Sequence, residues 1–198
     1  METGVKTGAL EAIVLAAGSG TRFGGGKLTA PWREGLLLDA ALDAAFAAPV
    51  RSVTVVWGAD EAVLQAASRY ADRTGQTARL HLAHNRQHAE GMGASLRNAV
   101  AGLPPDTAGA FVFLGDMPRI PHDIAPQLAE ALAAGARAAA PVHGDQRGHP
   151  ALFSAELFPA LRSLAGDKGA GWLLNAMTHG LTLIPTEDDG VLFDVDER

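Results

Sequence analysis

The chain has 198 residues, of which 47% are hydrophobic and 19% are charged, so it can bury a core of ordinary size and is not predicted to be disordered. Its formal net charge of −6 argues against a nucleic-acid partner, because such proteins bind through a broad basic surface. The absence of cysteine excludes disulfides, thiolate zinc sites and cysteine nucleophiles, and it fits a cytoplasmic protein.

The length favours one domain over residues 1–198, with residues 1–9 as a loose N-terminal tail. No apolar stretch reaches the length of a membrane span, because charged residues such as Asp39 and Arg137 interrupt the longest ones. We reject a secretion signal, since Glu11 precedes the first apolar run. No apolar stripe is left over from the core, so a monomer is expected.

Apolar segments rich in β-forming residues alternate with amphipathic segments rich in Ala and Leu, as is typical of βαβ units. This order predicts an α/β fold with three αβα layers around a mainly parallel, Rossmann-like sheet. The predicted strands are 12–17, 52–57, 79–84, 110–114, 138–142, 151–153, 181–185 and 191–195. The predicted helices are 36–48, 59–72, 93–102, 122–134, 155–164 and 169–178.

The first predicted strand runs into the glycine-rich segment LAAGSGTRFGGGK, from Leu15 to Lys27. Glycine lets the backbone come close to an anion, so that successive N–H groups can converge on phosphate oxygens. Arg22 offers a planar fork to such oxygens, and Lys27 offers a mobile positive charge. An ordinary glycine-rich turn is the alternative, and the spacing matches neither a P-loop nor a dinucleotide-binding loop.

Two further polar segments, 85–96 and 115–118, follow predicted strands. Open α/β sheets bind ligands beyond the carboxyl ends of their strands, so these segments and the glycine-rich loop predict one binding site. Asp116 is suited to binding Mg²⁺, or alternatively to capping a turn. The glycine-rich start of the helix at Gly91 favours an anion or carbonyl group, or is simply a helix start.

Several other residues invite a functional reading that their surroundings do not favour. His81, His84 and His88 do not share a helix face or a carboxylate partner, so we interpret them as a solvated polar edge rather than a metal site. The tryptophans are too scattered for base stacking, and core packing is expected for Trp32, Trp57 and Trp172.

Taken together, the motifs resemble the MobA-like NTP transferase family, and within it the molybdenum cofactor cytidylyltransferases. The loop is similar to the family pattern L-A-A-G-x-S-x-R-x-G-x-x-K, with its Ser placed one residue earlier than in many members. Four later segments also match, at Gly91–Leu96, Gly115–Pro118, Gly144–Pro150 and Asp194–Asp196. The resemblance implies the nucleotide-diphospho-sugar transferase type of sheet, and a nucleotidyltransferase that releases pyrophosphate.

The resemblance also implies roles for individual residues. It places Arg22, Lys27 and Asp116 in catalysis and assigns Mg²⁺ to Asp116 and Asp194, with Asp196 as an alternative ligand. It assigns the acceptor to Arg147, Gly148 and His149, while Gly171 stands where the family has an Arg. The implied nucleotide-binding residues are Leu15, Ala16, Ala17, Gly18, Ser19, Gly20, Asn85, Gly91, Met92 and Ser95.

The Leu-Ala-Ala-Gly form of the loop is similar to that of members that use CTP, whereas guanylyltransferase relatives usually carry a second glycine there. The resemblance therefore implies transfer of CMP from CTP to molybdopterin, with a molybdenum hydroxylase receiving the product, and neither nucleic acid nor membrane as a partner. A GTP-using guanylyltransferase and a non-catalytic module that delivers the cofactor are the alternatives.

Overall fold

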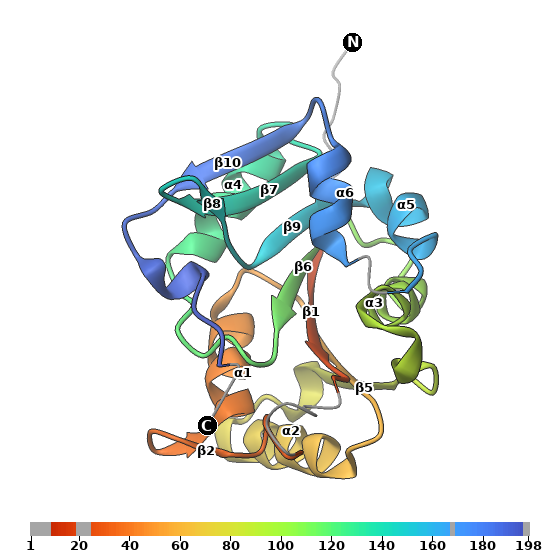
Figure 1. Ribbon diagram of the computed structural model, residues 1–198, viewed down its shortest axis with the longest axis vertical. Coiled ribbons are helices and arrows are strands. Elements are labelled where there is room, and N and C mark those ends of the chain that lie inside the picture. Colours follow the sequence, from red (N-terminus) through yellow and green to blue (C-terminus); the bar gives the residue numbers. More distant parts are fainter. Residues whose placement is uncertain (1–8, 19–24, 167–168, 196–198) are drawn as a thin grey trace.

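The computed structural model describes residues 9–18, 25–166 and 169–195. In these ranges, one eight-stranded sheet runs through the molecule with helices on both faces (Figure 1). The strand order is β10-β7-β9-β6-β1-β4-β5, and β8 pairs with β7. The predicted three-layer αβα architecture is confirmed.

The elements follow the predicted order closely, with the addition of three two-residue strands. The sheet contains β1 (Leu10–Ala16), β4 (Val53–Trp57), β5 (Leu80–His84), β6 (Gly109–Leu114), β7 (Ala138–His143), β8 (Gln146–Arg147), β9 (Ala151–Ser154) and β10 (Leu181–Pro185), and a separate hairpin joins β2 (Pro31–Trp32) to β3 (Gly35–Leu36). The helices are α1 (Leu37–Ala47), α2 (Glu61–Thr74), α3 (Met92–Ala101), α4 (Ile124–Ala133), α5 (Phe158–Arg162) and α6 (Ala170–Ala176).

The parallel part of the sheet determines where a ligand can bind. β1 lies between β4 and β6 and is parallel to both, and β5 continues the parallel set beyond β4. The carboxyl ends of these four strands therefore meet at one edge. β9 is antiparallel to its neighbours β6 and β7, which makes the sheet mixed, with a parallel half that contains β1.

Alternation of side chains along the strands builds one core on each face of the sheet. On β6, Phe111 and Phe113 face the core that α1, α2 and α4 cover, whereas Ala110 and Val112 face the core under α3, α5 and α6 (Figure 1). On β1, Val14 points to the first core and Ile13 to the second, and both are fully buried. The central strands are thus apolar on both faces, as expected of a covered parallel sheet.

The prediction of a strand at 191–195 is wrong. Residues Asp189–Val191 form one turn of 3₁₀ helix instead, because the Asp188 carboxylate accepts a 2.8 Å hydrogen bond from the Gly190 N–H. Val191 is fully buried in the core. The segment then passes the carboxyl end of β6, where the Val195 N–H donates to the Asp116 carbonyl at 3.1 Å.

The described helices do not combine the length and hydropathy of a membrane-spanning helix. Not one of them, within the part of the chain that the structure describes, is both long and apolar enough to cross a bilayer.

Candidate active site

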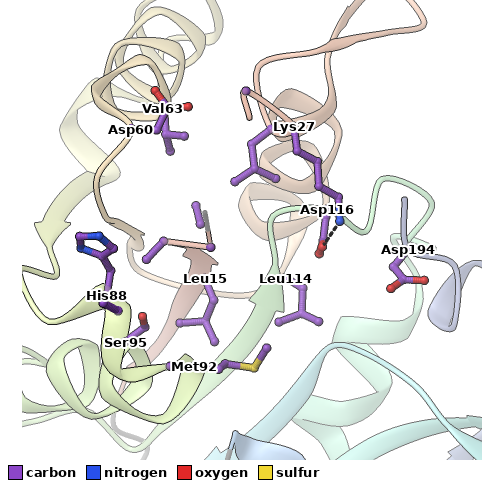
Figure 2. Close-up of a pocket in the computed structure, with 17 residues that line it drawn as sticks. Leu15, Lys27, Asp60, Val63, His88, Met92, Ser95, Leu114, Asp116 and Asp194 are labelled. Carbon is purple, nitrogen blue, oxygen red and sulfur yellow. Dashed lines mark hydrogen bonds and ion pairs between the residues drawn. The ribbon is translucent and has the colours of Figure 1, made fainter. Parts of the chain in front are cut away.

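A cavity of about 790 Å³ opens at the carboxyl edge of the parallel strands (Figure 2). Its wall is built from the end of β1, the segment before β2, the start of α2, the segment that leads into α3, the end of β6, and Asp194. The predicted convergence of the glycine-rich loop, the α3 segment and Asp116 at one edge is thus found in the structure. Leu15, Ala16, Ala17 and Gly18 form the part that β1 contributes.

One side of the cavity carries a pair of opposite charges. The Lys27 ammonium donates to Oδ2 of Asp116 at 2.8 Å, and the two side chains are 12% and 29% exposed. Asp116 is held in place because the Gly115 N–H extends the β6 pairing by bonding the Leu15 carbonyl at 3.0 Å. The pair is therefore fixed at the end of a buried strand yet remains accessible from the cavity.

Asp194 lies on the same side of the cavity, where the backbone hydrogen bond from the Val195 N–H to the Asp116 carbonyl holds its segment. Figure 2 shows Asp194 next to Asp116. Among the described residues, no group of three or more His, Cys, Asp or Glu side chains could hold a metal ion. Two carboxylates fit a hard cation such as Mg²⁺ or Mn²⁺, which completes its coordination with water and substrate phosphates. The residues present thus fit a metal that arrives together with a nucleotide.

The amino end of α3 forms another part of the cavity wall. Gly91 starts the helix with φ of 101°, a left-handed conformation that favours glycine, and Met92 and Ser95 follow it in the cavity wall. The Gly93 N–H in the first turn bonds the Gly166 carbonyl at 2.9 Å, and the dipole of a helix amino end attracts negative charge or carbonyl oxygens. This end of α3 is therefore suited to the oxygen-rich part of a nucleotide.

Asn85 contacts a residue of the cavity wall, Ser95, from the side away from the cavity. Its side chain is buried, its Nδ2 donates to the Ser95 hydroxyl at 2.9 Å, and its Oδ1 accepts from the Gln87 N–H at 3.0 Å. Because the Ser95 oxygen accepts from Asn85, its hydroxyl hydrogen is left to donate to a ligand. Asn85 thus orients Ser95 and does not line the cavity itself.

The sequence reasoning missed residues on the opposite side of the cavity, where Asp60, Val63 and His88 lie. His81 and His84 are exposed on β5, whereas His88 is half-buried and lines the cavity, a position that its interpretation as part of a solvated edge did not anticipate. Gly58 makes this possible, since a Cβ on it would come within 2.9 Å of the His88 Cβ. The combination of a glycine just after one strand and a histidine three residues after Asn85 was the available signal.

The three predicted acceptor residues do not line the cavity. Gly148 and His149 lie against Val191, and the His149 N–H donates to the Val191 carbonyl at 2.8 Å. Burial lowers the pKa of the His149 imidazole below its ordinary value, although Asp116 opposes the shift. Nδ1 of this ring is buried without a hydrogen-bond partner among the described residues. The acceptor role of all three residues stays a prediction.

Arg147 lies beside Gly171, the position where the family has its own arginine. Its Nη2 donates to the Gly171 carbonyl at 3.2 Å and to the Asn175 side chain at 2.9 Å. A positive charge from β8 is therefore present next to the first turn of α6, although the residue at 171 carries none.

The tryptophans divide into two groups. Trp32 packs against the core, and Trp57 is partly buried and stacks on His84 with ring centroids 4.0 Å apart. The prediction of core packing is wrong for Trp172, which is 49% exposed because it lies on the side of α6 away from Ala170 and Leu174. Ser19, Gly20, Arg22 and Asp196 lie outside the described residues, so their assignments stay predictions.

A nucleotidyl transfer needs a site that holds a nucleotide along its phosphates and offsets the charge on the departing group. The described part of the cavity offers the end of β1, a helix amino end and a lysine to the phosphates, and its two carboxylates would act through a bound cation. The sequence model described as the MobA-like NTP transferase domain matches residues 12–181, and the chain belongs to this family.

Similar proteins support this assignment. Molybdenum cofactor cytidylyltransferase of Escherichia coli is 30% identical over 146 residues, which cover 74% of this chain and 70% of that protein. The crystal structure of Rv0371c from Mycobacterium tuberculosis is 27% identical, with a TM-score of 0.78 over 96% of this chain and 93% of that one. A crystal structure of Rv0371c in complex with manganese is 25% identical, with a TM-score of 0.69 over 90% and 88% of the two chains.

Proposed function

We propose that this nucleotidyltransferase transfers CMP from CTP to the phosphate of molybdopterin and releases pyrophosphate. The observation that carries the proposal is the pairing of Lys27 with Asp116 in the wall of a cavity that also receives the β1 loop and the start of α3. The named Escherichia coli relative supports the choice of CTP and of the molybdenum cofactor. Ala17 lines the cavity at the position where guanylyltransferase relatives usually have glycine, which supports CTP over GTP.

The reaction needs no general base, because a phosphate nucleophile is already ionised at neutral pH. An acceptor phosphate oxygen attacks the α-phosphorus of CTP in line, a new P–O bond forms, and the bond to the bridging oxygen of the β-phosphate breaks. Pyrophosphate leaves with that electron pair. The chain's own residues contribute orientation and charge neutralisation, which together supply most of the rate in such transfers.

Lys27 has the central electrostatic role. In the structure its ammonium group interacts with Asp116, and a nucleotide phosphate near that position would be a further anionic partner for the same group. Lys27 then stabilises the negative charge that accumulates on the departing pyrophosphate. A divalent metal held by Asp116 and Asp194 would neutralise the nucleotide phosphates and polarise the α-phosphorus.

We propose that the acceptor binds on the side of the cavity where Asp116 and Asp194 lie, and that Arg147, Gly148 and His149, which do not line the cavity itself, contribute to holding it. Arg147 supports this orientation, because its guanidinium lies beside α6 and can attract a phosphorylated substrate. The product is a nucleotide form of the cofactor, and a molybdenum hydroxylase is the class of enzyme that would receive it.

A transfer assay tests the proposal directly. The protein is incubated with MgCl₂ or MnCl₂, molybdopterin and either CTP or GTP, and the pyrophosphate released is measured over time. We expect metal-dependent release with CTP and much slower release with GTP. Faster release with GTP would identify a guanylyltransferase instead, and binding of the finished dinucleotide cofactor without any pyrophosphate would identify a delivery module.

A further inference from the structure

We infer that His88 selects the nucleobase by accepting a hydrogen bond from an exocyclic amino group, so that the cavity favours cytosine over uracil. The inference rests on the proposed function, because it takes the cavity to be the nucleotide site. It adds a specificity-determining residue to a reaction whose chemistry lies at the other side of the cavity.

The cavity has two chemically different sides (Figure 2). Lys27 and Asp116 lie on one side, and Asp60, Val63 and His88 lie on the other, with the end of β1 between them. The charged side is suited to the phosphates and their metal. The base of the same nucleotide is therefore directed toward the side that contains His88.

The hydrogen bonding of the His88 ring determines what it offers to a base. Nδ1 lies 3.2 Å from the Asn85 carbonyl oxygen, which can only accept a hydrogen bond, so Nδ1 carries the hydrogen. In the neutral ring, Nε2 then holds a lone pair and acts as an acceptor. A donor on the ligand satisfies it, whereas another acceptor is repelled.

The ring is held in a fixed position, which selectivity requires. His88 begins a 3₁₀ turn that ends at Glu90, and its own N–H also bonds the Asn85 carbonyl, at 3.2 Å. Gly58 packs against it so closely that a Cβ there would lie 2.9 Å from the His88 Cβ and 2.8 Å from the Ala17 carbonyl oxygen. The ring therefore lies close to the end of β1, where Ala17 lines the cavity.

Asp60 reinforces the same preference. Its carboxylate caps α2 by accepting from the Ala62 N–H at 3.0 Å, and a carboxylate offers only further acceptor sites to a ligand. Asp60 and His88 thus both offer acceptors to a base, and Val63 adds an apolar surface, while the nearby Ser95 hydroxyl is a donor. At ring position 4, cytosine presents an amino group where uracil presents a carbonyl oxygen, so an acceptor that faces this position distinguishes two bases of the same shape. The bases differ again at N3, where cytosine accepts and uracil donates, so the selectivity requires that His88 Nε2 faces position 4.

Binding of CTP and UTP in the presence of Mg²⁺ tests the inference by calorimetry. We expect the protein to bind CTP about tenfold or more tightly than UTP, since one good hydrogen bond and one repulsive contact differ by at least that factor. His88→Phe keeps a ring of similar shape but removes the acceptor, and we expect it to reduce the ratio to about threefold or less. His81→Phe, on the exposed face of β5, is the matched control and should keep the original ratio.

Kinetics add a second readout, because His88 lies away from the reacting phosphorus. We expect His88→Phe to raise KM for CTP while kcat changes less than about twofold, the signature of lost binding that is equal in ground and transition states. An unchanged CTP-to-UTP ratio in His88→Phe would overturn the inference and leave the proposed function standing. Equal binding of CTP and UTP by the unaltered protein would also overturn it, and failure to bind any nucleotide would overturn both.

Discussion

A carboxylate pairs with a basic side chain near each end of β1, but the two pairs differ in burial and in their hydrogen bonds. At the amino end, Glu11 is 1% exposed and accepts hydrogen bonds from Nε of Arg51 at 2.6 Å and from the hydroxyl and N–H of Ser52 at 2.6 and 3.1 Å. Near the carboxyl end, the Asp116 side chain, which follows β6, is 29% exposed, and its Oδ2 accepts a hydrogen bond from the Lys27 ammonium group in the wall of the cavity.

The difference shows how a parallel sheet separates stability from chemistry. At the amino edge, Arg51 bridges Glu11 to Asp106, so the charged side chains next to β1, β4 and β6 satisfy one another. At the carboxyl edge, the chain leaves each strand in a loop, and the loops surround the cavity. The same kinds of charged groups therefore stabilise the fold at one edge and are available to a substrate at the other.

The largest expected effect concerns the carboxyl-edge pair. Asp116→Ala and Lys27→Ala should each lower the rate of CMP transfer by about a hundredfold or more, because each removes a preorganised charge from the reaction site. Pyrophosphate release with saturating Mg²⁺ measures the effect. Near-normal turnover in either variant would show that its residue does not act in transfer. Urea unfolding should show only a small change, which separates this pair from the one at Glu11.

Asp194 provides a test of the second carboxylate at the same edge. Asp194→Ala should lower transfer by about tenfold or more, with a higher Mg²⁺ concentration needed for half-maximal rate, because a metal ligand is lost. Asp189→Ala is the control, since Asp189 is paired with Arg119 by a 2.7 Å contact away from the cavity. If the metal dependence of Asp194→Ala equals that of the control, the second ligand lies elsewhere.

Glu11→Gln tests the amino edge and should have the opposite signature. It leaves Arg51 and Ser52 with a poorer partner, so we expect the free energy of unfolding to fall by about 2 kcal/mol, while transfer by the folded protein stays within about twofold. Urea unfolding and the pyrophosphate assay measure the two quantities. Asp106→Asn, at a side chain that is 67% exposed, should leave the unfolding midpoint nearly unchanged. A loss of transfer in Glu11→Gln at full stability would contradict this division of labour.

The smallest expected effect is a dependence of stability on pH that arises at His149, between the two edges. Burial holds the imidazole pKa in the folded protein below its usual value of 6.5. The unfolded chain therefore binds the proton more readily, and this contribution to stability is complete above pH 6.5 and decreases as the pH falls below it. Unfolding midpoints at pH 7.5 and 5.5 should differ less in His149→Gln than in the unaltered protein. His81→Gln, at an exposed site, should reproduce the unaltered difference.

Most elements could be predicted because the core is apolar and the periodicity is clear. The strand containing Phe111 and Phe113 and the helix containing Val63 and Tyr70 both appear close to their predicted bounds. The hairpin of β2 and β3 was missed because strands of two residues carry no periodicity. The apolar residues at 191–195 resembled a short strand, but the hydrogen bond from the Gly190 N–H to the Asp188 carboxylate closes a turn at the start of this segment.

The site was predictable where a motif is continuous in the sequence. Gly18, Lys27, Met92 and Asp116 follow strand ends or begin a helix, and the structure brings them to one cavity. Asp60, Val63 and His88 were missed because their role depends on how the starts of α2 and α3 approach each other. Periodicity and local spacing do not encode that approach.

The sequence alone determined that this chain forms an α/β sheet with its polar, cavity-lining residues at the carboxyl ends of the strands, because hydrophobic patterning and glycine placement are local properties. Only the tertiary structure decided the pairing of Lys27 with Asp116 across 89 positions, the arrival of Asp194 beside them, and the direction of the His88 ring. The physical reason is that hydrogen bonds and close contacts between distant segments depend on how the sheet and helices pack, which the order of residues specifies only through the whole fold.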